Sequence, residues 1–203
     1  MNIVIVDYGM GNIQSIIGAL HFIGVQNVVL SRAYADLEKA DKFILPGVGS
    51  FAKAMQTIRE TELKYYLDEF VMQRKKPILG ICLGMQLLGL SSTEHGNNDG
   101  LGYVPGVVTR FSGFSEKIPH VGFNQVVVNN ELKLYRNMDR VCDFYFTHSY
   151  CMQSEAPIHQ SYCTYGEKFI ASYEKDHIAG VQFHPELSQR DGLKLLKNFI
   201  EHF

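Results

Sequence analysis

The fold is decided by the stretch Pro77-Ile78-Leu79-Gly80-Ile81-Cys82-Leu83-Gly84-Met85-Gln86, in which an apolar run leads into a cysteine between two glycines. The apolar run predicts a buried strand, and the Gly-x-Cys-x-Gly spacing predicts a sharp turn from that strand into a helix. In this kind of elbow the glycines let the chain turn at little steric cost, and the central side chain stands clear of the sheet. Cys82 is therefore a candidate nucleophile, although the same string is also compatible with a tightly packed structural cysteine.

A second string, which contains residues suited to catalysis, lies about a hundred residues later, at Gly180-Val181-Gln182-Phe183-His184-Pro185-Glu186. A cysteine that attacks an acyl carbon needs a neighbour that carries protons, and the imidazole of His184 titrates in the right range. The carboxylate of Glu186 can fix the tautomer of that imidazole and stabilise its charged form. Pro185 biases His184 toward an extended backbone. The alternative is an ordinary surface turn, which the His-Pro-Glu sequence also permits.

The order of the remaining segments predicts an α/β fold, a mostly parallel sheet flanked by helices with additional antiparallel strands in the second half. Residues 1–203 contain no repeat or linker that would divide them, so we expect one domain. The first half alternates strand-like and helix-like segments, namely 3–6, 13–22, 28–30, 42–45, 51–74 and 77–81. The second half predicts strands at 104–111, 126–128, 144–146 and 169–173 and a final helix at 192–203.

Composition excludes several classes of protein. The 203 residues are 46% hydrophobic and carry a formal charge of −2, so they lack the basic character of a nucleic-acid-binding protein. The opening run lacks the basic start of a secretory signal, and no stretch has 18 consecutive apolar residues. We therefore expect a soluble, cytoplasmic protein without membrane contact.

No cofactor or metal site is expected. The glycines at 9 and 11 suggest a dinucleotide-binding loop, but Gln14 stands where the third glycine of G-x-G-x-x-G is required. Cys82, Cys142, Cys151 and Cys163 show no C-x-x-C spacing, which argues against a zinc site and against a disulfide framework.

Together these strings resemble the class I glutamine amidotransferases, a flavodoxin-like family that uses a Cys-His-Glu triad with the same two motifs. Within that family the chain is similar over nearly its whole length to HisH, the glutaminase subunit of imidazole glycerol phosphate synthase. The resemblance is carried by six segments in the family's order, 7–12, 45–51, 82–88, 118–124, 144–150 and 181–186.

The resemblance implies that Cys82, His184 and Glu186 hydrolyse L-glutamine to L-glutamate and ammonia. It implies an oxyanion hole made by the backbone N–H groups of Leu83 and Gly49. It also implies a heterodimer with a HisF-type (β/α)₈ barrel cyclase, which receives the ammonia through a channel and forms imidazole glycerol phosphate and AICAR in histidine biosynthesis. The remaining implied sites are glutamine-binding positions at Gln86, Glu94, Gly47, Thr147, His148 and Ser149, and partner-interface positions at Asn12, His120 and Phe123.

Two positions depart from the family pattern and leave the partner open. Leu187 stands where a basic residue commonly follows the His-Pro-Glu string, and Phe123 replaces a common tryptophan. One alternative is therefore a HisH-like amidotransferase that supplies ammonia for sugar modification in a surface-glycan pathway. Alternatives of other classes are a catalytically silent flavodoxin-like binding module and a cysteine peptidase or deglycase-type hydrolase on a similar sheet.

Overall fold

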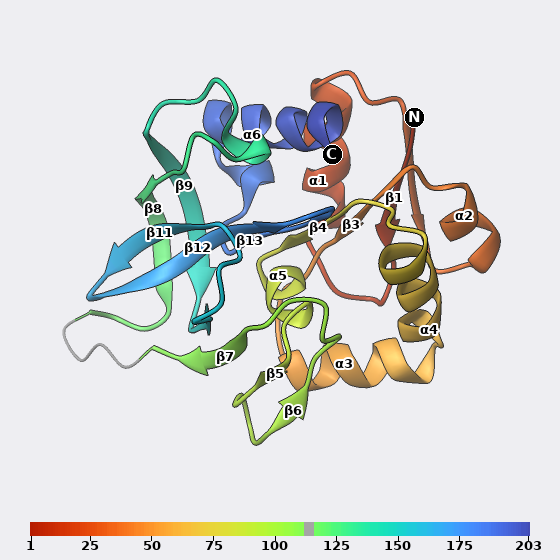
Figure 1. The fold of residues 1–203 in the computed structure, drawn as a ribbon, viewed down its shortest axis with the longest axis horizontal. Coiled ribbons are helices and arrows are strands. Elements are labelled where there is room, and N and C mark those ends of the chain that lie inside the picture. The colour runs from red at the N-terminus through yellow and green to blue at the C-terminus, as the bar shows by residue number, and fades with distance from the viewer. Residues whose placement is uncertain (112–115) are drawn as a thin grey trace.

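The computed structural model describes residues 1–111 and 116–203 and confirms the predicted α/β class. A large mixed sheet runs through the molecule, with helices on both of its faces (Figure 1). Its strand order is β2-β1-β3-β4-β13-β12-β11-β8-β9. The strands of this sheet are β1 (Asn2–Val6), β2 (Asn27–Ser31), β3 (Lys42–Leu45), β4 (Ile78–Ile81), β8 (His120–Val127), β9 (Val141–His148), β11 (Gln160–Tyr165), β12 (Glu167–Lys175) and β13 (Ile178–Val181).

The sheet changes character at β13. From β2 to β13 all neighbouring strands are parallel, whereas β13, β12, β11, β8 and β9 pair with one another antiparallel. Parallel order with helices on both faces is the doubly wound arrangement, in which sites form outside the carboxyl ends of the strands. A separate small sheet has the order β10-β7-β5-β6. Its strands are β5 (Ser91–Ser92), β6 (Asn98–Asp99), β7 (Val107–Arg110) and β10 (Tyr150–Gln153).

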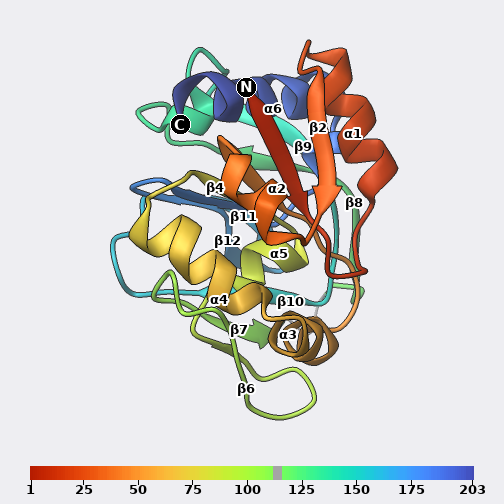
Figure 2. The same ribbon diagram turned by 90° about the vertical axis from the view of Figure 1, so that its right-hand side faces the viewer.

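The helices divide between the two faces of the large sheet. Helices α1 and α6 cover one face, and α2 to α5 with the small sheet lie on the other (Figures 1 and 2). The helical segments are α1 (Ile13–Phe22), α2 (Tyr34–Lys39), α3 (Phe51–Glu60), α4 (Leu63–Leu67), the π-helix η1 (Asp68–Gln73), α5 (Leu83–Leu87), the 3₁₀ turns η2 (Lys133–Tyr135) and η3 (Pro185–Leu187), and α6 (Gln189–His202).

Strand β1 shows why the sheet needs cover on both faces. Ile3 and Ile5 pack into the core under α1 and α6, whereas Val4 and Val6 pack into the core under α2 to α5. All four side chains are buried. Successive residues of a strand point to opposite faces, so an unbroken apolar run is the signature of a strand covered on both sides.

Several predicted boundaries were wrong. The predicted helix over 51–74 is three segments. Glu62 adopts a left-handed backbone with φ 59° and separates α3, which ends at Glu60, from α4, and α4 continues directly into the π-helix η1. The final helix begins at Gln189 instead of Gly192. The strands predicted at 126–128 and 144–146 extend much further, as β8 and β9, while the strand predicted at 104–111 is confined to β7. Short apolar runs mark where a strand lies but not how far its pairing continues.

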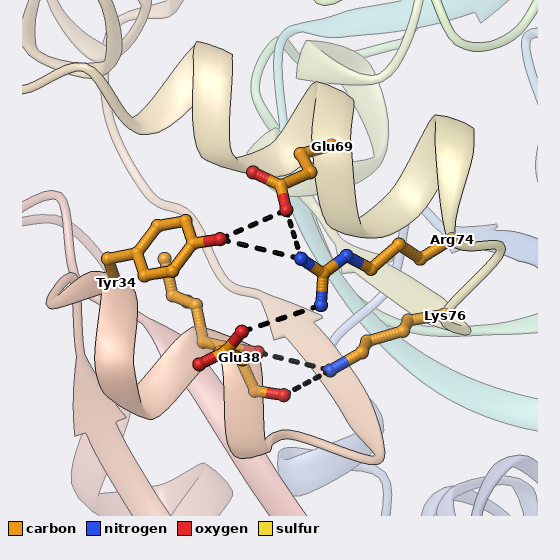
Figure 3. Close-up of polar contacts among 6 residues, drawn as sticks. Tyr34, Glu38, Glu69, Arg74 and Lys76 are labelled. Carbon is orange, nitrogen blue, oxygen red and sulfur yellow. Dashed lines mark hydrogen bonds and ion pairs between the residues drawn. The ribbon is translucent and has the colours of Figure 1, made fainter.

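A polar network ties α2 to the end of η1 (Figure 3). Glu69 accepts hydrogen bonds from the Tyr34 hydroxyl at 3.0 Å and from the Arg74 guanidinium. Arg74 also forms an ion pair with Glu38 at 3.6 Å. The ammonium of Lys76 donates to the carbonyls at the C-terminus of α2, where a cation also complements the helix dipole. This network fixes α2, an element that the sequence did not reveal, against the helical segment before β4.

Among residues 1–111 and 116–203, no helix has the length and apolar character needed to cross a membrane.

Candidate active site

Cys82 occupies a strained turn between β4 and α5. Its backbone has φ 53° and ψ −109°, a positive φ that is uncommon for a residue with a side chain. The flanking glycines are required by close packing. A Cβ on Gly84 would lie 1.8 Å from the carbonyl oxygen of Leu45, and one on Gly80 would lie 2.6 Å from the backbone nitrogen of Met85. The predicted elbow therefore exists, and its glycines allow α5 to lie directly against the sheet.

His184 reaches the same place from the neighbouring strand. Strands β13 and β4 are parallel, with Val181 opposite Ile81, so Cys82 and His184 both follow the carboxyl ends of adjacent strands. The backbone N–H of His184 donates to the carbonyl of Tyr145 at 2.8 Å. The Ser188 hydroxyl donates to the carbonyl of His184 at 2.6 Å and accepts from the backbone N–H of Tyr145 at 2.9 Å. These bonds hold the backbone of His184 against β9.

Glu186 lies on the 3₁₀ turn η3 and binds the imidazole of His184. The distance from Nδ1 to the carboxylate Oε1 is 2.8 Å, and the two side chains are 3% and 0% exposed. A carboxylate can only accept, so Nδ1 is the donor. Burial alone lowers the pKa of His184, but its interactions with Cys82 and Glu186 outweigh that effect and raise the pKa to about 10. Among the described residues Nε2 has no hydrogen-bond partner, which leaves it free to exchange a proton.

A cavity of about 420 Å³ opens at the sulfur of Cys82, within the size range of small-molecule sites. Most of the residues predicted to form the oxyanion hole or to bind glutamine lie on its wall. The lining residues are Val48, Gly49, Cys82, Leu83, Gln86, Glu94, Pro119, Thr147, His148, Ser149 and Tyr150.

The glycine loop before α3 borders this cavity. Gly49 has φ 100°, a conformation that favours glycine, and lies on the wall. Glu94 accepts a hydrogen bond at 2.8 Å from the backbone N–H of Phe51, directly after the loop. Gly47 is not among the residues that line the cavity, and a Cβ there would meet the Tyr8 hydroxyl at 2.5 Å. The hydroxyl of Tyr8 also binds the carbonyl of the residue before Gly47, so the base of the loop is fixed by packing.

Residues 4–203 match the family model "Glutamine amidotransferase class-I". The chain belongs to the class I glutamine amidotransferases. Similar curated proteins of this family include "Imidazole glycerol phosphate synthase subunit HisH 1" of Campylobacter jejuni, 45% identical over 199 residues and 98% of both chains. The "HisH 2" subunit of Pseudomonas aeruginosa is 44% identical over 202 residues and also covers 98% of both chains.

Solved structures agree with the fold of the class I glutamine amidotransferases. The chain superimposes on a structure titled "Crystal structure of glutamine amidotransferase" with a TM-score of 0.76 at 18% identity, covering 98% of this chain and 97% of the other. It superimposes on "Structure of PurLQS from Thermotoga maritima" with a TM-score of 0.76 at 19% identity and the same coverage.

The predicted interface residues of this class I glutamine amidotransferase do not share one exposed surface. Phe123 is 51% exposed, but His120, on the opposite face of β8, is 2% exposed. The Nδ1 atom of His120 lies 3.1 Å from Nε2 of His148, its register partner on β9. Burial lowers the pKa of His120 to about 4 and that of His148 to about 3. Asn12 is half-buried at the N-terminus of α1.

One residue of the site was missed by sequence reasoning. Gln182 is fully buried, and its side-chain Nε2 lies 3.7 Å from Sγ of Cys82. Its position two residues before His184, in a strand-like run with period 2, was the available signal. Within the described part of the chain, no cluster of His, Cys, Asp or Glu side chains could hold a metal ion.

Proposed function

We propose that this chain is the glutaminase subunit of an imidazole glycerol phosphate synthase. Residues 1–203 act as one domain that hydrolyses L-glutamine and passes the ammonia to a HisF-type barrel cyclase. The observation that carries the chemistry is the arrangement of Cys82, His184 and Glu186 after two adjacent parallel strands, beside a cavity. The assignment to histidine biosynthesis rests on the near-full-length relatives whose names contain HisH.

The thiolate of Cys82 attacks the side-chain amide carbon of glutamine and forms a tetrahedral oxyanion. Backbone N–H groups of Leu83 and Gly49, both on the cavity wall, are the proposed donors to that oxygen. His184 gives its Nε2 proton to the departing nitrogen, ammonia leaves, and a γ-glutamyl thioester remains. The same imidazole then takes a proton from water, which attacks the thioester and releases glutamate. Glu186 stabilises the imidazolium throughout.

The cavity wall supplies groups for both ends of the amino acid. The carboxylate of Glu94 suits the α-ammonium group of glutamine, and its side chain is 12% exposed toward the cavity. Gln86 lies close to the sulfur and suits the amide end. The segment 147–149 contributes Thr147, His148 and Ser149 to the same wall, where backbone groups suit the α-carboxylate. Gly47, also one of the predicted glutamine-binding positions, belongs to the same glycine loop and packs closely against Tyr8 and Leu83.

The partner is proposed to bind the outer stripe, which we define as Val121, Phe123 and Val127 on β8 with Tyr145 and Val141 on β9. The three β8 side chains are 56%, 51% and 54% exposed, and they face the same side of the strand. Phe123 and Tyr145 are register partners, with ring centroids 5.6 Å apart. An exposed apolar patch of this kind marks a protein contact.

The outer stripe begins beside the cavity. Val121 pairs with Thr147, which lies on the cavity wall. A barrel bound here would lie next to the site where ammonia is released, as channelling requires. His120 is buried on the opposite face of β8, so we propose Val121 in its place as an interface residue beside Phe123 and Asn12.

A second acceptor for the ammonia is favoured by two observations. Leu187, at the position where the family commonly has a basic residue, is 39% exposed. Four of the similar curated proteins carry numbered names, HisH 1 or HisH 2, which indicates paralogous copies in those organisms. We therefore retain a HisH-like amidotransferase of surface-glycan modification as the alternative. A lost surface ion pair at position 187 costs about 0–1 kcal/mol, too little to decide between the two acceptors.

The deciding experiment measures glutamate release from glutamine by the purified chain, alone and with a HisF-type barrel plus its nucleotide ligand. Strong stimulation that is lost in Cys82→Ala but kept in Cys163→Ala, a buried cysteine on β11, supports the proposal. Activity only with a barrel homologue from a glycan locus supports the alternative function, in surface-glycan modification. Glutamate release that survives Cys82→Ala refutes the mechanism.

A further inference from the structure

The sulfur of Cys82 has a second polar neighbour besides His184. The amide Nε2 of Gln182 donates to Sγ at 3.7 Å, and the side chain of Gln182 is fully buried. The backbone N–H of Gln182 donates to the carbonyl of Ala171 on β12 at 2.8 Å, which fixes the residue directly after β13. The steps described above assign no role to this amide.

The orientation of the Gln182 side-chain amide follows from two hydrogen bonds of Gln86, one of which has a partner that can only accept. The carbonyl of Tyr150 can only accept, so the atom of Gln86 that binds it at 2.9 Å is the nitrogen. The second hydrogen of that nitrogen meets the side chain of Gln182 at 2.9 Å, so the atom of Gln182 found there is the oxygen. The other end of the Gln182 amide, which faces the sulfur, is therefore the N–H donor.

We propose that Gln182 is a further catalytic residue, whose N–H group holds the sulfur of Cys82 and stabilises the thiolate that attacks the substrate. The proposal rests on the proposed role of Cys82 as nucleophile. A hydrogen bond from a neutral donor to a charged sulfur is stronger than one to a neutral thiol, so the contact favours the charged form.

The opposing contact shows why such a donor is needed. The carbonyl of Thr147 lies 3.9 Å from Sγ of Cys82 and accepts from the S–H group, which favours the neutral thiol. Cys82 is also 6% exposed, and burial without a donor disfavours a charged group. Gln182 and protonated His184 are the groups that shift this balance toward the thiolate.

The test is the rate at which iodoacetamide alkylates Cys82 in the full chain, followed by peptide mass spectrometry across about pH 6–9, where thiolate formation controls the rate. Burial raises the pKa values of Cys142, Cys151 and Cys163 to about 11, 12 and 12, so these thiols react slowly and serve as internal references. In Gln182→Met we expect the rate at neutral pH to fall about tenfold and the rate profile to move up by about one pH unit.

A second variant covers the case in which Gln182→Met does not fold. Gln182→Glu keeps the shape and the oxygen that accepts from Gln86, but replaces the donor with a charged acceptor, so we expect alkylation slower still. The matched control is Asn198→Leu, which removes another buried amide, one that donates to carbonyls at 134 and 136 away from the cavity. It should react at the wild-type rate.

Alkylation of folded Gln182→Met at the wild-type rate, with an unchanged pH profile, overturns the proposal. If Gln182→Met does not fold, a wild-type rate in Gln182→Glu overturns it. The assay contains no glutamine and no partner. Absence of glutamate release by the wild-type chain would therefore refute the proposed function without changing the alkylation result, so the two failures can be distinguished.

Discussion

Replacing Glu186 by glutamine should move the alkaline limit of activity to lower pH. The change preserves the size of the side chain and removes its charge. In the wild type the imidazolium of His184 is 2.8 Å from a carboxylate that is completely buried. In Glu186→Gln the imidazole remains buried, and burial disfavours its protonated form.

The size of the shift follows from the burial of this pair. Removing one partner of a buried ion pair costs about 3–5 kcal/mol, and one pKa unit corresponds to about 1.4 kcal/mol. The wild-type pKa of His184 is raised to about 10, with Cys82 and Glu186 both contributing. Because Cys82 is retained, we expect the pKa of His184 to fall by roughly two to three units in the variant.

The same shift makes a prediction for stability. The folded pKa of His184 lies above its unfolded value, so the stabilisation by the pair is complete below about pH 6.5 and disappears as pH rises through about 10. The free energy of unfolding of the wild type should therefore decrease between these pH values. Glu186→Gln should be less stable at neutral pH and should lose most of this dependence.

The assay is the pH dependence of kcat/KM for glutamate release in the presence of the barrel partner. The wild type should retain activity until His184 deprotonates near pH 10, and Glu186→Gln should lose it roughly two to three pH units earlier. Glu201→Gln is the matched control, because it neutralises an exposed carboxylate of α6 that pairs with a lysine. An alkaline limb at the same pH in wild type and Glu186→Gln would refute the assigned role of the carboxylate.

Further predictions concern packing and partner binding. Gly84→Ala should lower the free energy of unfolding by about 3 kcal/mol in urea titration, because its Cβ would lie 1.8 Å from a carbonyl oxygen of β3. The control Gly18→Ala on α1, where a Cβ would meet nothing within 4 Å, should be neutral or stabilising. Equal effects of the two substitutions would contradict this prediction. Ser188→Ala should cost about 1–3 kcal/mol in the same titration and slow glutamate release, since its hydroxyl joins η3 to β9; an unchanged variant would show that these bonds contribute nothing. Phe123→Glu should abolish stimulation by the barrel and leave alkylation of the site cysteine unchanged. Phe22→Glu, at an even more exposed aromatic position on α1, should be stimulated normally. Equal stimulation of both phenylalanine variants would place the interface elsewhere.

The sequence predicted those parts of the fold that local chemistry determines. The strands at 3–6 and 42–45 were confirmed, because buried parallel strands read as short apolar runs. The elbow at Cys82 was also predicted from local sequence, because its glycines occupy positions where a Cβ would collide with the backbone. The unbroken helix over 51–74 was wrong. Helical spacing of apolar residues continues across Glu62, and hydrophobic periodicity does not detect one residue with φ 59°.

The parts of the site could be identified one by one, but their proximity could not be derived from the residues alone. Strands β4 and β13 are neighbours, although β5 to β12 lie between them in the sequence. Pairing between strands so distant in sequence has no local signal, and the family resemblance supplied it instead. The buried position of His120 was also missed, because the register that pairs it with His148 is set by β8 and β9 together.

The string that ends β13 shows how one short segment can serve both the core and the site. Phe183 is fully buried and stacks on Phe144 with centroids 3.8 Å apart, whereas its neighbours Gln182 and His184 both face the region of the sulfur. Alternation of this kind is the period-2 geometry of an extended chain, continued past the last paired residue of the strand. Glu186 then requires a different geometry, because it has to bind the ring of His184 from the side away from the thiol. The 3₁₀ turn begun by Pro185 provides it, and this explains why the proline stands between the two residues.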